Sequence, residues 1–83
     1  MYILNIDKKE YKTGTIRGIV NVIEGMDIDL DEFMTANVNR HIDTPDYDHY
    51  ELTSMLREKV HYELTKGKCE LQYAGIKFNI KKL

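Results

Sequence analysis

Acidic, imidazole and aromatic side chains crowd one short stretch in the middle of the chain. From His41 to His49 there are two imidazoles and three carboxylates, which are the groups that bind zinc, manganese or iron. Their spacing matches no metal template, and a loop before a helix favours Asp for turn formation and capping alone. We therefore predict no metal and no other cofactor, and a metal site at this cluster is the alternative.

Tyrosine adds to the case for a protein contact at this stretch. Tyr47 and Tyr50 lie among the carboxylates, and tyrosine suits interfaces because its ring buries area while its hydroxyl keeps a hydrogen-bond partner. The alternative is that some of the chain's tyrosine rings only cap the core. The predicted partner-binding residues are Asp43, Asp46, Tyr47, Asp48, Tyr50 and Glu51.

Charge is divided unevenly along the chain, although the net charge is only −2. Residues 24–51 contain nine acidic residues and one basic residue, whereas the segments on either side are net positive. Such a segment attracts cationic partners and repels nucleic acid within a Debye length of about 8–10 Å. This pattern predicts a protein partner with a basic surface. The alternative is that several of these acids only cap helices, whose first turns favour Asp and Glu.

Motifs for catalysis or ion binding are incomplete. The run Asp27–Asp31 resembles the opening of a calcium-binding EF-hand loop, but the sixth position is Glu32 instead of Gly and the twelfth is Val38 instead of Glu. No base accompanies Cys69 or Ser54 in a pattern typical of nucleophilic catalysis. We therefore predict that the protein is not an enzyme.

Nucleic-acid binding is the alternative function. Three helices followed by a hairpin could form a winged helix-turn-helix, with the third helix in the major groove. Acidic residues at the start of that helix oppose this reading, because they would face phosphates. The predicted contacts under this alternative are Arg57, Lys59, His61, Lys77, Lys81 and Lys82.

The sequence pattern of the N-terminal half predicts a strand and a helix. Residues 2–6 alternate and are rich in Ile and Tyr, which predicts a strand, and residues 8–14 are polar and end at Gly14, which predicts a turn or loop. Apolar residues at 16, 19, 20 and 23 predict a helix that ends at Gly25. A strand remains the alternative over 15–24, because these apolar residues are β-branched.

The C-terminal half predicts two more helices and a hairpin. Asp29 and Glu32 have capping-box spacing, so a second helix begins near Leu30 and fades over 37–40. Asp48 and Glu51 repeat this spacing before a third helix that ends at Lys66. Residues 69–73 and 76–81 alternate across Ala74-Gly75, which predicts a hairpin with a positive φ at Gly75.

These elements predict one α+β domain over residues 1–83, with three helices on a small antiparallel sheet of the N-terminal strand and the C-terminal hairpin, in the order β-α-α-α-β-β. We expect a homodimer, since a sheet this small leaves a face or an edge open. No apolar run approaches the roughly 20 residues of a membrane span, and no signal peptide is evident, so a cytoplasmic location is expected. The predicted function is a non-enzymatic protein-binding or regulatory module, one form of which is a mobile-element inhibitor that mimics the charge of nucleic acid.

Overall fold

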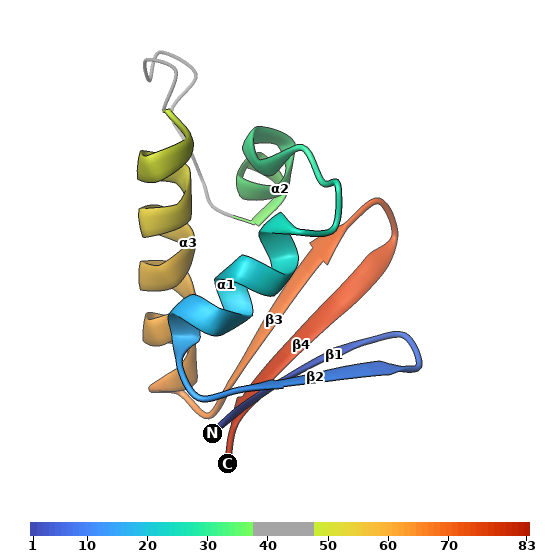
Figure 1. Cartoon of the computed structure of the whole chain (residues 1–83), viewed down its shortest axis with the longest axis vertical. Helices are drawn as coiled ribbons and strands as arrows, with labels where there is room; N and C mark the ends of the chain where they lie inside the picture. The colour runs from blue at the N-terminus through green and yellow to red at the C-terminus, as the bar shows by residue number, and fades with distance from the viewer. Residues whose placement is uncertain (38–47) are drawn as a thin grey trace.

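The computed structural model describes residues 1–37 and 48–83, which form a four-stranded antiparallel sheet and three helices (Figure 1). In chain order the elements are β1 (Tyr2–Ile6), β2 (Lys9–Thr13), α1 (Ile16–Glu24), α2 (Leu30–Asn37), α3 (His49–Leu64), β3 (Lys68–Tyr73) and β4 (Ile76–Lys82). The predicted α+β class is confirmed, with its N-terminal strand, three helices and C-terminal hairpin. No helix among the described residues is both long and apolar enough to cross a membrane.

The first and last strands meet at the centre of the sheet. The strand order is β2-β1-β4-β3, and every neighbouring pair is antiparallel. Tyr2 lies opposite Lys82 and Ile6 lies opposite Phe78. The N–H of Leu83 donates to the carbonyl of Met1 at 2.9 Å, so both chain ends lie at the same corner of the fold (Figure 1).

The prediction of a turn or loop over residues 8–14 is wrong, because Lys9–Thr13 form β2. A two-residue turn joins this strand to β1, and Asp7 takes a φ of 53° in that turn, a left-handed conformation that Asp tolerates better than most residues. Tyr11 is the only apolar side chain in β2, so the strand lacks a clear apolar alternation. The sheet therefore has four strands instead of three, and the order is β-β-α-α-α-β-β.

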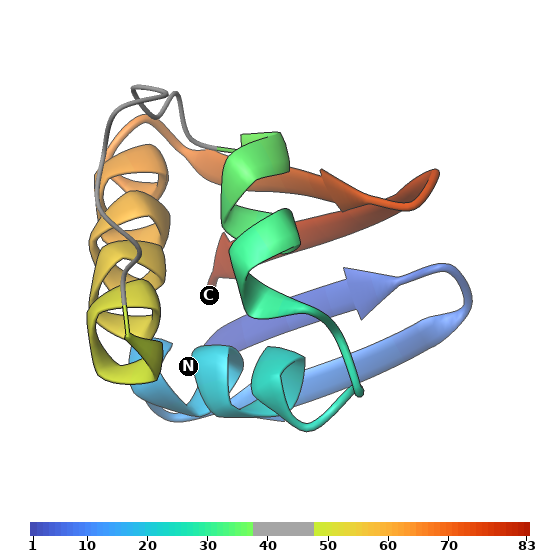
Figure 2. The ribbon, with the colours of Figure 1, turned by 90° about the horizontal axis from the view of Figure 1, so that it is seen from above.

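The three helices cover one face of the sheet and leave the other face open (Figure 2). Successive residues of a strand point to opposite faces, so Leu4, Leu71 and Ile80 face the helices and are buried. The buried apolar core is Leu4, Ile19, Val20, Ile23, Leu30, Phe33, Met34, Leu52, Leu56, Val60, Cys69, Leu71, Phe78 and Ile80. These residues come from the three helices and from three of the strands, so the core is one continuous layer between helices and sheet.

Residues 16–24 form a helix, and the alternative of a strand is wrong. Thr15 caps α1, since its hydroxyl accepts a hydrogen bond from the N–H of Gly18 at 3.0 Å. Gly18 also permits close packing on the sheet, because a Cβ there would lie 2.8 Å from the Cβ of Thr13 in β2. The capping and the close approach together explain why a segment rich in β-branched residues is helical here.

Contacts with the C-terminal hairpin fix α2. The ring of Phe33 packs edge-on against Phe78, with 5.3 Å between centroids. At the last residue of α2, the Asn37 amide donates to the carbonyl of Gln72 at 2.9 Å and accepts from its N–H at 2.8 Å. Asn37 therefore makes with the outer edge of β3 the pair of hydrogen bonds that another strand would make.

The C-terminal half follows its predicted pattern with small shifts. Helix α3 ends at Leu64, two residues before the predicted end, with Thr65 as its C-cap. Ala74 and Gly75 both have positive φ values, 52° and 80°, as a two-residue type I′ hairpin turn requires. The predicted positive φ at Gly75 is thus confirmed, and Leu71 lies opposite Phe78 across the hairpin.

The buried thiol of Cys69 makes the stability of the fold depend on pH. Burial, aided by the carboxylate of Glu63, raises the pKa of this thiol to about 11. In an unfolded chain a thiol titrates near about 8.5. The native state favours the neutral thiol. The contribution of Cys69 to the free energy of unfolding is therefore complete at a pH below the thiol pKa of the unfolded chain, and it is lost as the pH rises to about 11.

We therefore expect the free energy of unfolding of the wild type, relative to that of Cys69→Ala, to fall by about 2 kcal/mol between pH 8.5 and pH 11. Urea denaturation of both proteins across this pH range measures the difference. A difference that stays constant with pH would contradict the burial of a protonated thiol.

Candidate acidic interaction surface

Helix α2 and the first turn of α3 lie in the upper part of the helix layer in Figure 1, and the loop that follows α1 leads into α2 on the side away from α3. These segments and the end of α1 carry carboxylates. We call this surface the acidic end. Its described members are Glu24, Asp27, Asp29, Asp31, Glu32, Asp48 and Glu51, and Tyr50 lies beside the last two of these. All are exposed except Glu24, which is half-buried.

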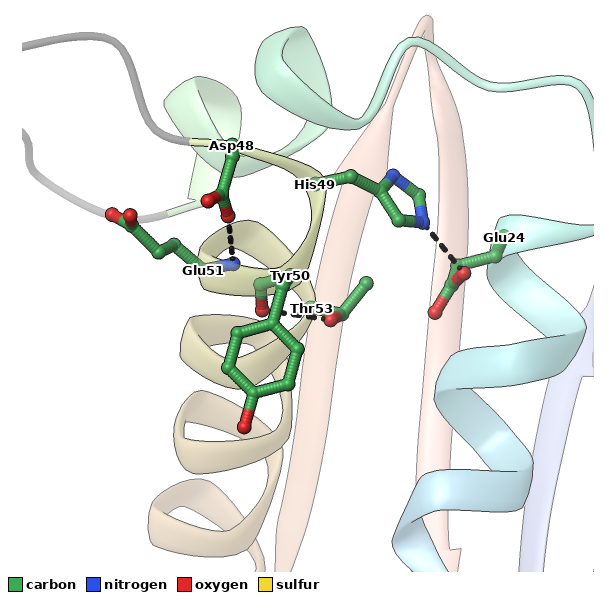
Figure 3. Close-up of polar contacts among 6 residues, drawn as sticks. All are labelled: Glu24, Asp48, His49, Tyr50, Glu51 and Thr53. Carbon is green, nitrogen blue, oxygen red and sulfur yellow. Dashed lines mark hydrogen bonds and ion pairs between the residues drawn. The ribbon is translucent and has the colours of Figure 1, made fainter.

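Two of these carboxylates hold helix N-termini. An oxygen of Asp29 accepts hydrogen bonds from the N–H groups of Asp31 and Glu32, at 3.0 and 3.2 Å. Asp48 accepts from the N–H of Glu51 at 2.8 Å (Figure 3). Both predicted caps are therefore confirmed. The capping role does not bury either carboxylate, so the same groups fix the helices and carry charge on the surface.

A polar contact between His49 and Glu24 joins α1 to α3. The imidazole Nε2 of His49 lies 2.9 Å from a carboxylate oxygen of Glu24 (Figure 3). His49 is 69% exposed and Glu24 is 27% exposed, so solvent screens the contact and it contributes little to stability. The contact shows that helix packing places the end of α1 beside the start of α3.

Tyr73 connects the acidic end to the sheet. Its hydroxyl donates to the carboxylate of Glu32 at 3.1 Å, and its ring packs against Phe33 with 5.8 Å between centroids. Partial burial, together with the hydrogen bond to Glu32, raises the pKa of the Tyr73 hydroxyl above its usual range. The Glu32 carboxylate is thereby held in place at the start of α2.

Tyr50 and Glu51 point away from the core. Tyr50 is 72% exposed, and its ring lies along the outer side of α3 (Figure 3). The backbone carbonyl of Tyr50 accepts a hydrogen bond from the hydroxyl of Thr53 at 2.9 Å. This bond is local to the start of α3 and leaves the Tyr50 ring without a role in it. A large exposed aromatic ring beside carboxylates is a feature of contact surfaces.

The structure brings together the part of the predicted partner site that it describes. Asp48, Tyr50 and Glu51 lie side by side on the first turn of α3. Asp43, Asp46 and Tyr47 lie outside the described residues. The predicted site did not include the carboxylates of α1 and α2, although the charge pattern over residues 24–51 signalled them.

The residues predicted for nucleic-acid binding are divided between two faces. Lys77 and Lys81 alternate with buried residues of β4, so they lie on the open face of the sheet, opposite α3. His61 and Lys82 line a small hollow of about 140 Å³ on the helix side, with Tyr2, Ile16, Leu64 and Thr65. Arg57 is half-buried on α3. These side chains do not form one continuous basic surface.

Lys59 is also occupied within its own helix. Its ammonium group lies 2.9 Å from a carboxylate oxygen of Glu63. The hydrogen bond from Lys59 lowers the pKa of Glu63, which favours the ionised carboxylate beside Lys59. A phosphate would have to compete with this carboxylate for Lys59.

Comparison with protein-family models, with curated proteins and with solved structures finds no match for this chain. The function is therefore inferred from the residues and their geometry alone.

Replacing Asp48 separates its capping role from its charge. We expect Asp48→Ala to lower the free energy of unfolding by about 1 kcal/mol, since the N–H of Glu51 loses its partner. Asp48→Asn should change it little, because Asn caps as well as Asp does. Thermal or urea denaturation measures both. Equal losses in the two variants would mean that the charge, and not the hydrogen bond, stabilises α3.

Proposed function

We propose that the protein is a non-enzymatic binding or regulatory module that uses the acidic end to bind a protein partner with a basic surface. The observation that carries this proposal is the set of exposed carboxylates on α2, on the loop between α1 and α2 and at the start of α3, where the exposed ring of Tyr50 lies beside Asp48 and Glu51. No Lys or Arg lies within residues 24–37 or 48–51. The segments that form this surface therefore carry no Lys or Arg of their own among the described residues.

Two carboxylates of this end, Glu51 and Glu24, are not paired with a Lys or Arg side chain among the described residues. Within the described ranges, Glu51 makes no ion pair with another side chain, and Glu24 contacts only the exposed imidazole of His49. Cationic side chains of a partner would meet carboxylates held on rigid helix ends, which reduces the conformational entropy lost on binding. Complementary charge also raises the rate of association.

One concrete form of this function is inhibition by charge mimicry. A surface of fixed carboxylates presents negative charges to Arg and Lys side chains that normally contact phosphates. Such a module would compete with nucleic acid for a nucleic-acid-processing protein. Composition adds a weak argument for a mobile-element origin, since Ile, Lys, Tyr and Asn are abundant, a bias common in AT-rich genomes. A cytoplasmic location and the expected homodimer stay predictions.

Nucleic-acid binding remains the second candidate, and the open face of the sheet favours it. Lys12, Lys77 and Lys81 are exposed on this face, at register positions that alternate with buried residues. The face carries Glu10 and Glu70 as well, and its described side chains include no aromatic ring on which a base could stack. Its charge is therefore only weakly positive.

Affinity capture with a charge-neutralised variant tests the proposal. In the variant Glu32→Gln/Asp48→Asn/Glu51→Gln, Gln and Asn keep the hydrogen bonds to Tyr73 and to the α3 backbone, so the fold should persist. We expect the wild type to retain a basic protein from nuclease-treated lysate and the variant to lose it. Retention should also weaken at high salt, because the contact is between charges.

A matched control removes three carboxylates elsewhere on the surface: Asp7→Asn/Glu58→Gln/Glu70→Gln. This control has the same net charge as the test variant and should still retain the partner. Equal loss from both variants would mean that only net charge matters and would contradict a defined site. In a parallel capture from untreated lysate, recovery of nucleic acid alone, unchanged in the test variant, would favour the second candidate.

A further inference from the structure

The two edges of the sheet differ in what covers them. At the β3 edge, Asn37 already pairs with both main-chain groups of Gln72. Next along that edge, Lys68 and Glu70 form an ion pair at 3.0 Å, and the hydrogen bond from Lys68 lowers the pKa of Glu70. The outward main-chain groups of Gln72 are therefore already paired within the chain, and the side chains of Lys68 and Glu70 are paired with each other.

The β2 edge has no such cover. Because a two-residue turn joins β1 to β2, Lys9 pairs with Ile6 through main-chain hydrogen bonds, and Tyr11 and Thr13 also turn their main-chain groups toward β1. Glu10 and Lys12 consequently direct their N–H and C=O groups away from the sheet. Within residues 1–37 and 48–83, nothing pairs with these groups, and the two side chains form no ion pair.

We propose that two copies of the chain join through this edge, as a symmetric antiparallel pair of β2 strands centred on Tyr11. In this register Glu10 of each copy lies opposite Lys12 of the other, and both pairs exchange main-chain hydrogen bonds. The sheet then runs continuously through eight strands. The pairing gives the predicted homodimer a specific edge and does not depend on the function of the acidic end.

Charge selects this register over its neighbours. If the symmetric pairing is centred on residue 10 instead of residue 11, Glu10 of one copy lies opposite Glu10 of the other. If it is centred on residue 12, Lys12 of one copy lies opposite Lys12 of the other. Like charges directly opposite each other on a sheet are unfavourable, whereas opposite charges stabilise the pair. Only the register centred on Tyr11 has two attractive pairs and no repulsive one.

Tyr11 also favours a neighbour at this edge. Its ring lies on the helix side, where it packs against the core while staying half-buried. It lines an open hollow of about 790 Å³ together with Ile6, Met26 and the β1–β2 turn. At the dimer axis the two Tyr11 rings would face each other, as an aromatic cross-strand pair that covers apolar area left open in one chain.

Charge swaps test the pairing by sedimentation velocity over a wide range of protein concentration. We expect the wild type to be a dimer, and Glu10→Lys or Lys12→Glu to weaken it by about tenfold or more, since each change makes both pairs repulsive. The double variant Glu10→Lys/Lys12→Glu should restore the dimer. An equimolar mixture of the two single variants should form a mixed dimer, because one chain then carries a cation at both positions and the other carries a carboxylate at both.

The control Lys77→Glu makes the same charge change as Lys12→Glu on the open face, away from this edge, and should leave the dimer intact. Circular dichroism checks that each variant keeps its fold. A monomeric wild type at every concentration would overturn the proposal. A dimer that neither single variant weakens would also overturn it, since the copies would then meet through another surface.

Discussion

The pairing of β1 with β4 is the constraint on which the rest of the structure depends. Each of the two hairpins forms from residues close in sequence, but neither has more than two strands, and a lone hairpin is marginal in water. The register from Tyr2–Lys82 to Ile6–Phe78 joins the hairpins into one sheet. It also places Leu4 beside Ile80, both fully buried, and these side chains form the floor against which the helices pack.

The proposed interaction surfaces lie at the periphery of this arrangement. One face of the central strands is buried in the core. Charged side chains therefore lie at the helix ends, on the open face of the sheet and on the outer strands. The helix caps Asp29 and Asp48 show how the two demands combine, since each satisfies backbone N–H groups while its charge stays exposed. An acidic surface built from caps costs little stability, because carboxylates are favourable at helix N-termini.

Local patterns made most of the fold predictable. The spacing of Asp48, Glu51 and the apolar residues behind them determines α3, and Ala74-Gly75 determines the hairpin turn. β2 was not predictable in this way, because an exposed edge strand with one apolar residue is held by its pairing to β1 and not by its own pattern.

For the site, Asp48, Tyr50 and Glu51 were predicted together, whereas the approach of Glu24 to His49 depends on helix packing. The separation of Lys77 and Lys81 from α3 follows from strand alternation once the covered face is known.

The central claim is that the pairing of the two terminal strands, β1 and β4, holds the fold together. Native-state amide hydrogen exchange is the most direct test of this claim. The N–H groups of Ile3, Asn5, Asn79 and Lys81 face the opposite central strand, as the bond from Leu83 to Met1 indicates. These amides should exchange only through global unfolding and so report the full free energy of unfolding. If they exchanged through local opening while the β3–β4 hairpin stayed protected, the β1–β4 pairing would be peripheral, and this interpretation of the structure would be contradicted.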